Sequence, residues 1–318
     1  MKRGALTSLL ILLAIAAASI VLAVVCGSVT LDWSALLRDS DPTTRIILLE
    51  LRLPRALSAF AIGALLALSG ALMQILLRNP LADPYVLGLS GGAAVAALGA
   101  LMLGAAGLIV SGAALGGALF SVFLVFTLAR GDYSFTHARL LLTGVVVAAG
   151  WGAAISLLLV LAPDARLRGM LFWLMGDLGT AGFPWLALST LVAMLALCLP
   201  WGGSLNILAQ GDLTARALGV PVAQLRRLLY FAASACAAVA VTSAGTIGFV
   251  GLLAPHMARM ALGNDQRLLL PGAALMGGAL LTLADTAART VIAPAQLPVG
   301  ALTAALGVPL FLYLMARR

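Results

Sequence analysis

Long apolar runs separated by short polar breaks make up most of the chain. A transmembrane helix needs about 20 predominantly apolar residues. Ten segments meet or approach this requirement: 6–27, 56–77, 85–104, 107–129, 138–162, 183–201, 225–243, 246–262, 268–288 and 297–315. Gly and Pro interrupt the third and the eighth of them. The pattern predicts an all-α polytopic membrane protein with about ten transmembrane helices, formed by a single domain over residues 1–318.

One stretch, residues 202–224, interrupts this pattern with polar residues. It contains "GDLTARALGVP", in which Asp212 is a favourable N-cap, Leu213 to Leu218 can form a short helix, and Gly219 and Pro221 end it. Leu213, Ala217 and Leu218 would form an apolar face, with Arg216 on the polar side. Two interpretations remain open: an ordinary amphipathic connector, or a helix that inserts into a groove on another protein.

Composition and charge support the membrane interpretation and orient the chain. Charged residues are 9% of the 318 and apolar residues 63%, whereas a soluble domain has about 25% charged residues. With the N-terminus inside and ten spans, the inside segments hold twelve Lys and Arg and the outside segments seven. Because cytoplasmic loops are enriched in Lys and Arg, both termini and residues 202–224 are predicted to be cytoplasmic. The net charge of +8 does not indicate nucleic acid, since the cations are spread over short breaks rather than one face.

Two stretches of the chain resemble each other. Residues 51–74 and 225–248 both begin with two arginines and reach Ser-Gly or Ser-Ala-Gly after an Ala/Leu-rich run, and they are predicted to start on opposite sides of the membrane. This arrangement is typical of the inverted repeats of transporters. Chance similarity between Ala/Leu/Gly-rich helices is the open alternative.

The residues that usually carry catalysis or ion coupling are sparse. No phosphate-binding loop is present, and His137 and His256 have no metal-ligand spacing, so we predict no metal site, no cofactor in this chain and no enzymatic activity. The three cysteines are predicted to be small core residues. Asp285 lies four residues before Arg289, which favours a local ion pair over a coupling carboxylate. Energy for transport is therefore expected from a partner.

Several stretches together identify a resemblance. These are "LRLPRALSAFAIGALLALSGALMQILLRNPLADPYVLGLSGGA" (51–93), "FWLMGDL" (172–178), "TARALGV" (214–220), "GTIGFVGLLAPHMAR" (245–259) and "QLPVGALTAALGVPLFLYL" (296–314). In these residues the chain resembles the permease subunits of binding-protein-dependent ABC importers for iron chelates and vitamin B12. The resemblance implies a homodimer in the bacterial inner membrane, two cytoplasmic ATPase subunits that hold ATP-Mg, and a periplasmic substrate-binding protein.

The resemblance also implies roles for individual residues. The helix around residues 212–219 corresponds to the coupling helix that contacts the ATPase, with Asp212, Leu213, Arg216, Ala217, Leu218 and Gly219 as its residues. Three arginines correspond to docking positions for acidic side chains of the binding protein: Arg52, Arg55 and Arg289. Thr143 and Gly144 correspond to the constriction of the translocation path at the cytoplasmic side, where two subunits meet.

The sequence therefore favours the permease of an ATP-driven importer for a bulky metal chelate: a ferric siderophore, haem or a cobalamin. An ion-coupled secondary transporter and a non-transporting membrane scaffold are the alternatives. The residues do not distinguish among the three chelates, because none of them is a diagnostic metal or corrin ligand.

Overall fold

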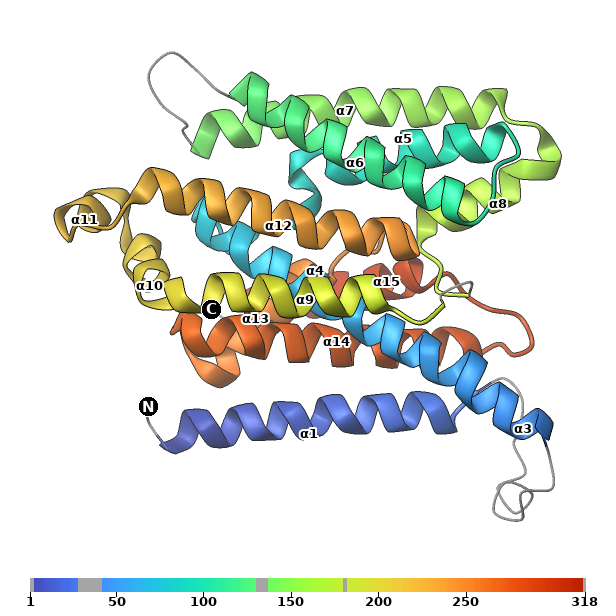
Figure 1. The fold of residues 1–318 in the computed structure, drawn as a ribbon, viewed down its shortest axis with the longest axis horizontal. Coiled ribbons are helices and arrows are strands. Elements are labelled where there is room, and N and C mark those ends of the chain that lie inside the picture. Colours follow the sequence, from blue (N-terminus) through green and yellow to red (C-terminus); the bar gives the residue numbers. More distant parts are fainter. Residues whose placement is uncertain (1–2, 28–41, 130–136, 180–181, 317–318) are drawn as a thin grey trace.

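The computed structural model describes residues 3–27, 42–129, 137–179 and 182–316, which form helices and turns without strands (Figure 1). The elements are α1 (Arg3–Val25), α3 (Pro42–Ile46), the π-helix η1 (Ile47–Arg52), α4 (Leu53–Leu77), the 3-10 helix η2 (Pro84–Leu87), α5 (Leu89–Met102), α6 (Leu108–Ala129), α7 (His137–Leu161), α8 (Asp164–Met175), α9 (Trp185–Cys198), the 3-10 helix η3 (Leu199–Trp201), α10 (Gly202–Gln210), α11 (Asp212–Ala217), α12 (Val222–Ala244), α13 (Val250–Leu262), α14 (Gln266–Thr290) and α15 (Val299–Ala316).

Each of the ten predicted apolar segments contains a helix, so the prediction of an all-α polytopic fold is confirmed. Seven helices in the described part are long and apolar enough to cross a membrane, and α5, α13 and α15 are shorter than predicted. Gly88, with a φ of 72°, separates η2 from α5, and Phe249 adopts the left-handed conformation directly before α13. Helix α8 was not predicted, because its run of 12 residues is too short and too charged to read as a span.

Helix α4 is the central helix of the bundle. Almost all of its apolar length is buried, and it packs against α12, α13 and α14. Helices α5, α6 and α7 form a second layer on one side of this group, and α1 packs against α14 on the other (Figure 1). Small residues permit the close crossings, as is common between helices in membranes.

Two glycine crossings fix the position of α4. A Cβ atom at Gly63 would overlap the carbonyl oxygen of Gly277 in α14, and one at Gly70 would overlap the carbonyl oxygen of Gly251 in α13. The backbones therefore meet at these points with no space for a side chain.

The first turn of α1, the end of α15 and helix α11 lie toward the same end of the bundle, at the left in Figure 1. That the termini and residues 202–224 share one side of the membrane, and that this side is the cytoplasm, stay predictions from the charge bias. The single domain and the inverted repeat also stay predictions.

Substitution at the α4–α14 crossing should destabilise the protein. Gly63→Ala places a methyl group against backbone, and overpacking of this kind costs about 1–3 kcal/mol. Gly116→Ala in α6 is the matched control, because a Cβ there meets no atom within 4 Å. We expect a lower thermal unfolding midpoint in detergent for Gly63→Ala and an unchanged or higher one for Gly116→Ala. Equal unfolding midpoints for the two variants would show that α4 and α14 accommodate the added methyl group without a loss of stability.

Candidate functional site

Helix α11 has six residues. It lies at the same end of the bundle as the first turn of α1. The sequence predicted Asp212 as its N-cap, and this is wrong: Gly211 occupies the cap position, with a φ of 137°, and Asp212 is the first residue of the helix. No side-chain cap hydrogen bond forms there. The reason is that the Asp212 carboxylate is engaged by two guanidinium groups.

Asp212 bridges two arginines from different helices. Its Oδ1 accepts a hydrogen bond from Nη2 of Arg78, the residue that ends α4, at 2.5 Å. Its Oδ2 accepts one from Nη2 of Arg226, in the second turn of α12. Charge-assisted hydrogen bonds are among the stronger polar contacts in proteins. One carboxylate therefore connects α11 to α4 and α12.

The C-terminal end of α11 confirms the predicted stop at Gly219. This residue has a φ of 75°, its N–H donates to the carbonyl of Arg216, and the N–H of Val220 donates to the carbonyl of Ala215. This pair of hydrogen bonds is a Schellman motif. Glycine adopts the required left-handed conformation at little cost, and Asn is the next most tolerant residue.

The predicted apolar face of α11 points away from the rest of the chain. Leu213 is 86% exposed and Leu218 63% exposed, while Ala215 is fully buried. Arg216 and Ala217 are also exposed. Exposed leucines on a helix in a polar segment are suited to a partner's groove.

A polar cavity of about 630 Å³ lies beside α11, between the end of α4, α10 and the turn before α14. Its lining residues include Gln74, Arg78, Asn206, Arg259 and Asp265. The Asn206 side chain donates to the Asp265 carboxylate at 2.9 Å and, with the backbone N–H of Arg267, lowers the pKa of that carboxyl below its ordinary value. These contacts fasten α10 to the turn that precedes α14.

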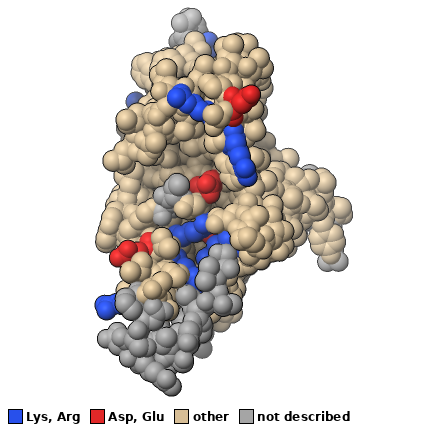
Figure 2. Space-filling model, turned by 90° about the vertical axis from the view of Figure 1, so that its right-hand side faces the viewer, with Lys and Arg blue, Asp and Glu red and all other residues tan. Residues whose placement is uncertain are grey.

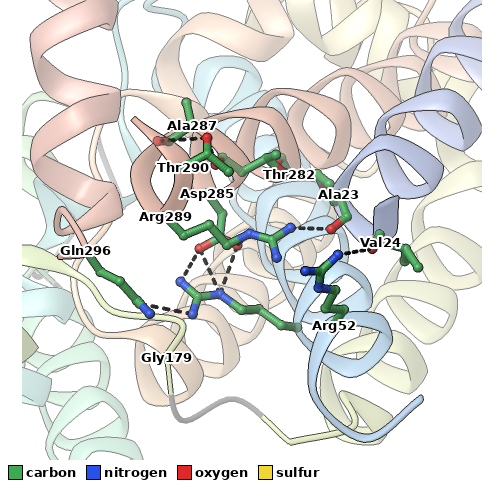
Figure 3. A network of polar contacts seen from close by, with 12 residues as sticks. Ala23, Val24, Arg52, Gly179, Thr282, Asp285, Ala287, Arg289, Thr290 and Gln296 are labelled. Carbon is green, nitrogen blue, oxygen red and sulfur yellow. Dashed lines mark hydrogen bonds and ion pairs between the residues drawn. The ribbon is translucent and has the colours of Figure 1, made fainter. Parts of the chain in front are cut away.

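At the opposite end of α4, Arg55 forms an ion pair with Asp285 of α14 (Figure 3). Arg55 Nε donates to both carboxylate oxygens at 3.0 and 3.2 Å, and Nη2 donates to Oδ1 at 2.8 Å. The predicted pair between Asp285 and Arg289 is present, but its closest contact is 3.6 Å. The main partner of Asp285 is therefore Arg55, and the local spacing identified only the weaker contact.

Arg52 and Arg289 are buried and hold the end of α1. Arg52 Nη1 donates to the carbonyls of Val24 and Val25, at 3.1 and 2.8 Å, and Arg289 Nη2 donates to the carbonyl of Ala23. The last carbonyls of a helix lack intrahelical partners and carry partial negative charge, so cations there are favourable. Figure 2 shows this end of the molecule, where basic and acidic side chains gather on an otherwise uncharged surface.

The structure thus brings the three predicted docking arginines together at one end of the bundle. Arg55 is the most open of them: its Nη1 donates to the side chain of Gln296 at 3.1 Å at the exposed edge of the network. Arg52 and Arg289 are 5% exposed. The role of all three in docking stays a prediction.

The predicted constriction residue Gly144 faces its own chain. It is buried, and a Cβ there would meet the carbonyl oxygen of Val86 at 2.6 Å and the Cα of Leu87 at 3.0 Å, both in η2. The contact between α7 and η2 therefore requires a small residue here. Thr143 is half-buried beside it. The role of Gly144 and Thr143 at a constriction between two subunits stays a prediction.

The other polar and sulfur-containing groups fit packing roles. His256 is buried with its ring edge-to-face with Phe311, at a centroid distance of 6.2 Å. Cys198 and Cys236 are buried free thiols as predicted, and Cys26 is half-buried. Among the described residues, no three His, Cys, Asp or Glu side chains come together as metal ligands.

The fold and these two polar networks describe a polytopic helical protein with a short exposed helix at one end. The chain belongs to the FecCD transport family, whose model matches residues 10–317. It is 41% identical over 283 residues to the vitamin B12 import system permease protein BtuC of Serratia proteamaculans, covering 87% of this chain and 84% of that protein. It is 43% identical over 333 residues to the hemin transport system permease protein HmuU of Yersinia pestis, covering 99% and 95%.

Solved structures agree with this assignment. A metal-chelate type ABC transporter in an inward-facing conformation matches with a TM-score of 0.88 and 30% identity, covering 98% of this chain and 99% of that chain. PsaBC from Streptococcus pneumoniae, at a TM-score of 0.55 and 17% identity, shares the fold. The chain is accordingly a non-catalytic permease subunit of an ABC importer.

Removing the carboxylate that holds Arg55 should destabilise the protein. Asp285→Asn leaves buried guanidinium groups without their counter-charge, and breaking a buried ion pair in this way costs about 3–5 kcal/mol. Asp164→Asn on exposed α8 is the control and should change stability by less than about 0.5 kcal/mol. Thermal unfolding in detergent measures both. A similar midpoint for the two variants would mean that Asp285 does not stabilise the network.

Proposed function

We propose that this chain is the membrane-spanning subunit of an ATP-driven importer that moves a bulky metal chelate across the bacterial inner membrane into the cytoplasm. Its substrate is a ferric siderophore, haem or a cobalamin. Family membership, together with similarity to permeases named for vitamin B12 and for hemin, carries this proposal. The chain works with a second copy of itself, two cytoplasmic ATPase subunits that bind ATP-Mg, and a periplasmic binding protein.

The geometry of α11 supports the ATPase as its partner. The helix presents Leu213 and Leu218 outward, and a Schellman motif fixes its C-terminal end. A short helix with a fixed end moves as one body. An ATPase groove that closes around it would therefore displace the adjoining spans.

The exposed face of α7 supports a second copy of the chain. Leu142, Val146, Leu157 and Val160 are all exposed, whereas Gly144 anchors the opposite side of the helix to η2. Contiguous apolar surface of this kind is covered by lipid or by a partner. In the proposed dimer this face borders the translocation path on the two-fold axis.

Arg55 is the residue best placed to meet the binding protein. Its guanidinium lies at the open edge of the network, and a planar guanidinium pairs well with an incoming carboxylate. Arg52 and Arg289, which are buried, contribute positive charge at the same end of the bundle. We propose that acidic side chains of the binding protein compete with Asp285 for Arg55.

ATP-dependent uptake tests the proposed function. The chain is reconstituted in liposomes with its ATPase and binding protein, and uptake of labelled hemin, a ferric siderophore and cyanocobalamin is measured with and without ATP. We expect one of the three to accumulate only when ATP is hydrolysed. Uptake by the chain alone, driven by an ion gradient, would instead support a secondary carrier. No uptake and no ATPase binding would support a scaffold.

Gly219→Val should uncouple hydrolysis from uptake. A β-branched residue is strained at a φ of 75°, so the end of α11 should loosen. Uptake per ATP hydrolysed should therefore fall, because the ATPase would displace a helix whose end is no longer fixed. Gly219→Asn is the matched control, because Asn tolerates the left-handed conformation and should retain coupling. Normal coupling in the Val variant would count against the role of α11.

Two variants at the other end separate docking from folding. Arg55→Gln should weaken binding-protein affinity by about tenfold or more, since losing one partner of a charge pair costs 2 kcal/mol or more. Asp285→Asn frees Arg55 and should leave that affinity unchanged or increase it. Both affinities are measured by surface plasmon resonance at a temperature where both variants are folded. If both variants weaken binding equally, Arg55 has only a structural role.

A further inference from the structure

The Arg78–Asp212–Arg226 triad is the polar link between α11 and two buried spans. We infer that Arg78 and Arg226 are positioning residues that, through Asp212, transmit displacement of α11 to α4 and α12. This inference rests on the proposed function, in which an ATPase drives α11. It assigns a role to two arginines that lie outside the helix itself.

Within the described residues, α11 packs only against its chain neighbours α10 and α12 apart from the triad. Its one buried residue is Ala215, a small side chain, and its leucines face outward. The helix follows Gly211, which has a φ of 137°, and the Schellman motif at Gly219 fixes the end of the helix but not its orientation in the bundle. Glycines are the positions at which a backbone bends most readily, and a helix of six residues is unstable in isolation. Its orientation therefore depends on the contacts that Asp212 makes.

Arg78 connects Asp212 to the central helix. It ends α4 with φ 49° and ψ 36°, a left-handed conformation that is uncommon for residues other than glycine. Such a conformation persists where surrounding contacts hold it. The 2.5 Å ion pair to Asp212 is such a contact. Since α4 is buried along nearly its whole length, a displacement at Arg78 reaches the middle of the bundle.

Arg226 connects the same carboxylate to α12. The side chain is 10% exposed, so its charge depends on Asp212 far more than a surface arginine would. Each carboxylate oxygen of Asp212 serves one arginine, which fixes the direction of the carboxylate as well as its position. The neighbouring Arg227 is exposed and donates to the carbonyl of Ala223 in its own helix, at 3.4 Å. It is the natural control for Arg226.

The experiment has a structural arm and a functional arm. Hydrogen–deuterium exchange of residues 212–219 is measured on the full permease for wild type, Asp212→Asn, Arg226→Gln and Arg227→Gln. Uptake per ATP hydrolysed is measured for the same variants in the complete transporter, with whichever of hemin, ferric siderophore or cyanocobalamin the wild type transports. Thermal unfolding confirms that each variant is folded.

We expect Asp212→Asn and Arg226→Gln to accelerate exchange in α11 about fivefold, as local opening becomes easier, and to lower uptake per ATP by a similar factor. Arg227→Gln should change neither. In a double-variant cycle with Arg78→Gln alone, Asp212→Asn alone and both together, the double variant should lower uptake per ATP little more than Asp212→Asn does. The effects of residues that act as one unit are not additive.

Three results would overturn the inference. Unchanged exchange in Asp212→Asn would show that the triad does not fasten α11. Faster exchange with normal uptake per ATP would show that the triad does not transmit displacement of α11 to α4 and α12. A wild-type permease that binds no ATPase would remove the proposed function and the transmission role together, and exchange in the isolated permease would still show whether the triad fastens the helix.

Discussion

At each end of α4 one aspartate is shared by two arginines, and the arrangement of the bundle depends on these two carboxylates. Asp285 holds Arg55 and Arg289, and Asp212 holds Arg78 and Arg226. Charges near a membrane interior are costly unless they are paired or reach water. Each carboxylate therefore ties the end of the central helix to a second helix, α14 at one end and α12 at the other.

Between these ends, α4 is held by close packing rather than by charge. Gly63 and Gly70 bring its backbone against α14 and α13, and α12 packs along its side. A helix that is packed this tightly transmits force along its axis because its surroundings are not compressible. The arginine network around Asp285 and the exposed helix α11, at opposite ends of α4, are thus connected through one rigid element. For an importer, such a connection relates events on one side of the membrane to events on the other.

The sequence predicted the helices well because lipid imposes a simple rule. Spanning segments must satisfy their own backbone hydrogen bonds and present apolar side chains, so apolar runs mark them directly. Helices α5 and α13 begin later than predicted, since hydropathy does not register left-handed residues such as Gly88 and Phe249. The end of α11 at Gly219 was predictable for the opposite reason: it depends on a local backbone preference.

The contacts of the candidate sites were less predictable because most of them join distant residues. Asp285 was paired with Arg289 from helical spacing, but its closest partner, Arg55, lies 230 residues away. Asp212 was assigned to capping from its position, yet it contacts Arg78, 134 residues away. Gly144 was assigned to a constriction between subunits, which stays a prediction, and the tertiary fold adds a reason for its small size, the contact with η2 of the same chain. In each case the residue type was informative and the partner was determined by the tertiary fold.

The two sides of α7 have different tolerance for sequence change. At Gly144 an added Cβ meets the backbone of η2, whereas Val145 and Val146 are 52% and 64% exposed. Packing within the chain therefore restricts substitution at Gly144 but not on the outward side. In the proposed dimer, the outward side could change with the substrate while the contact with η2 keeps the helix in place.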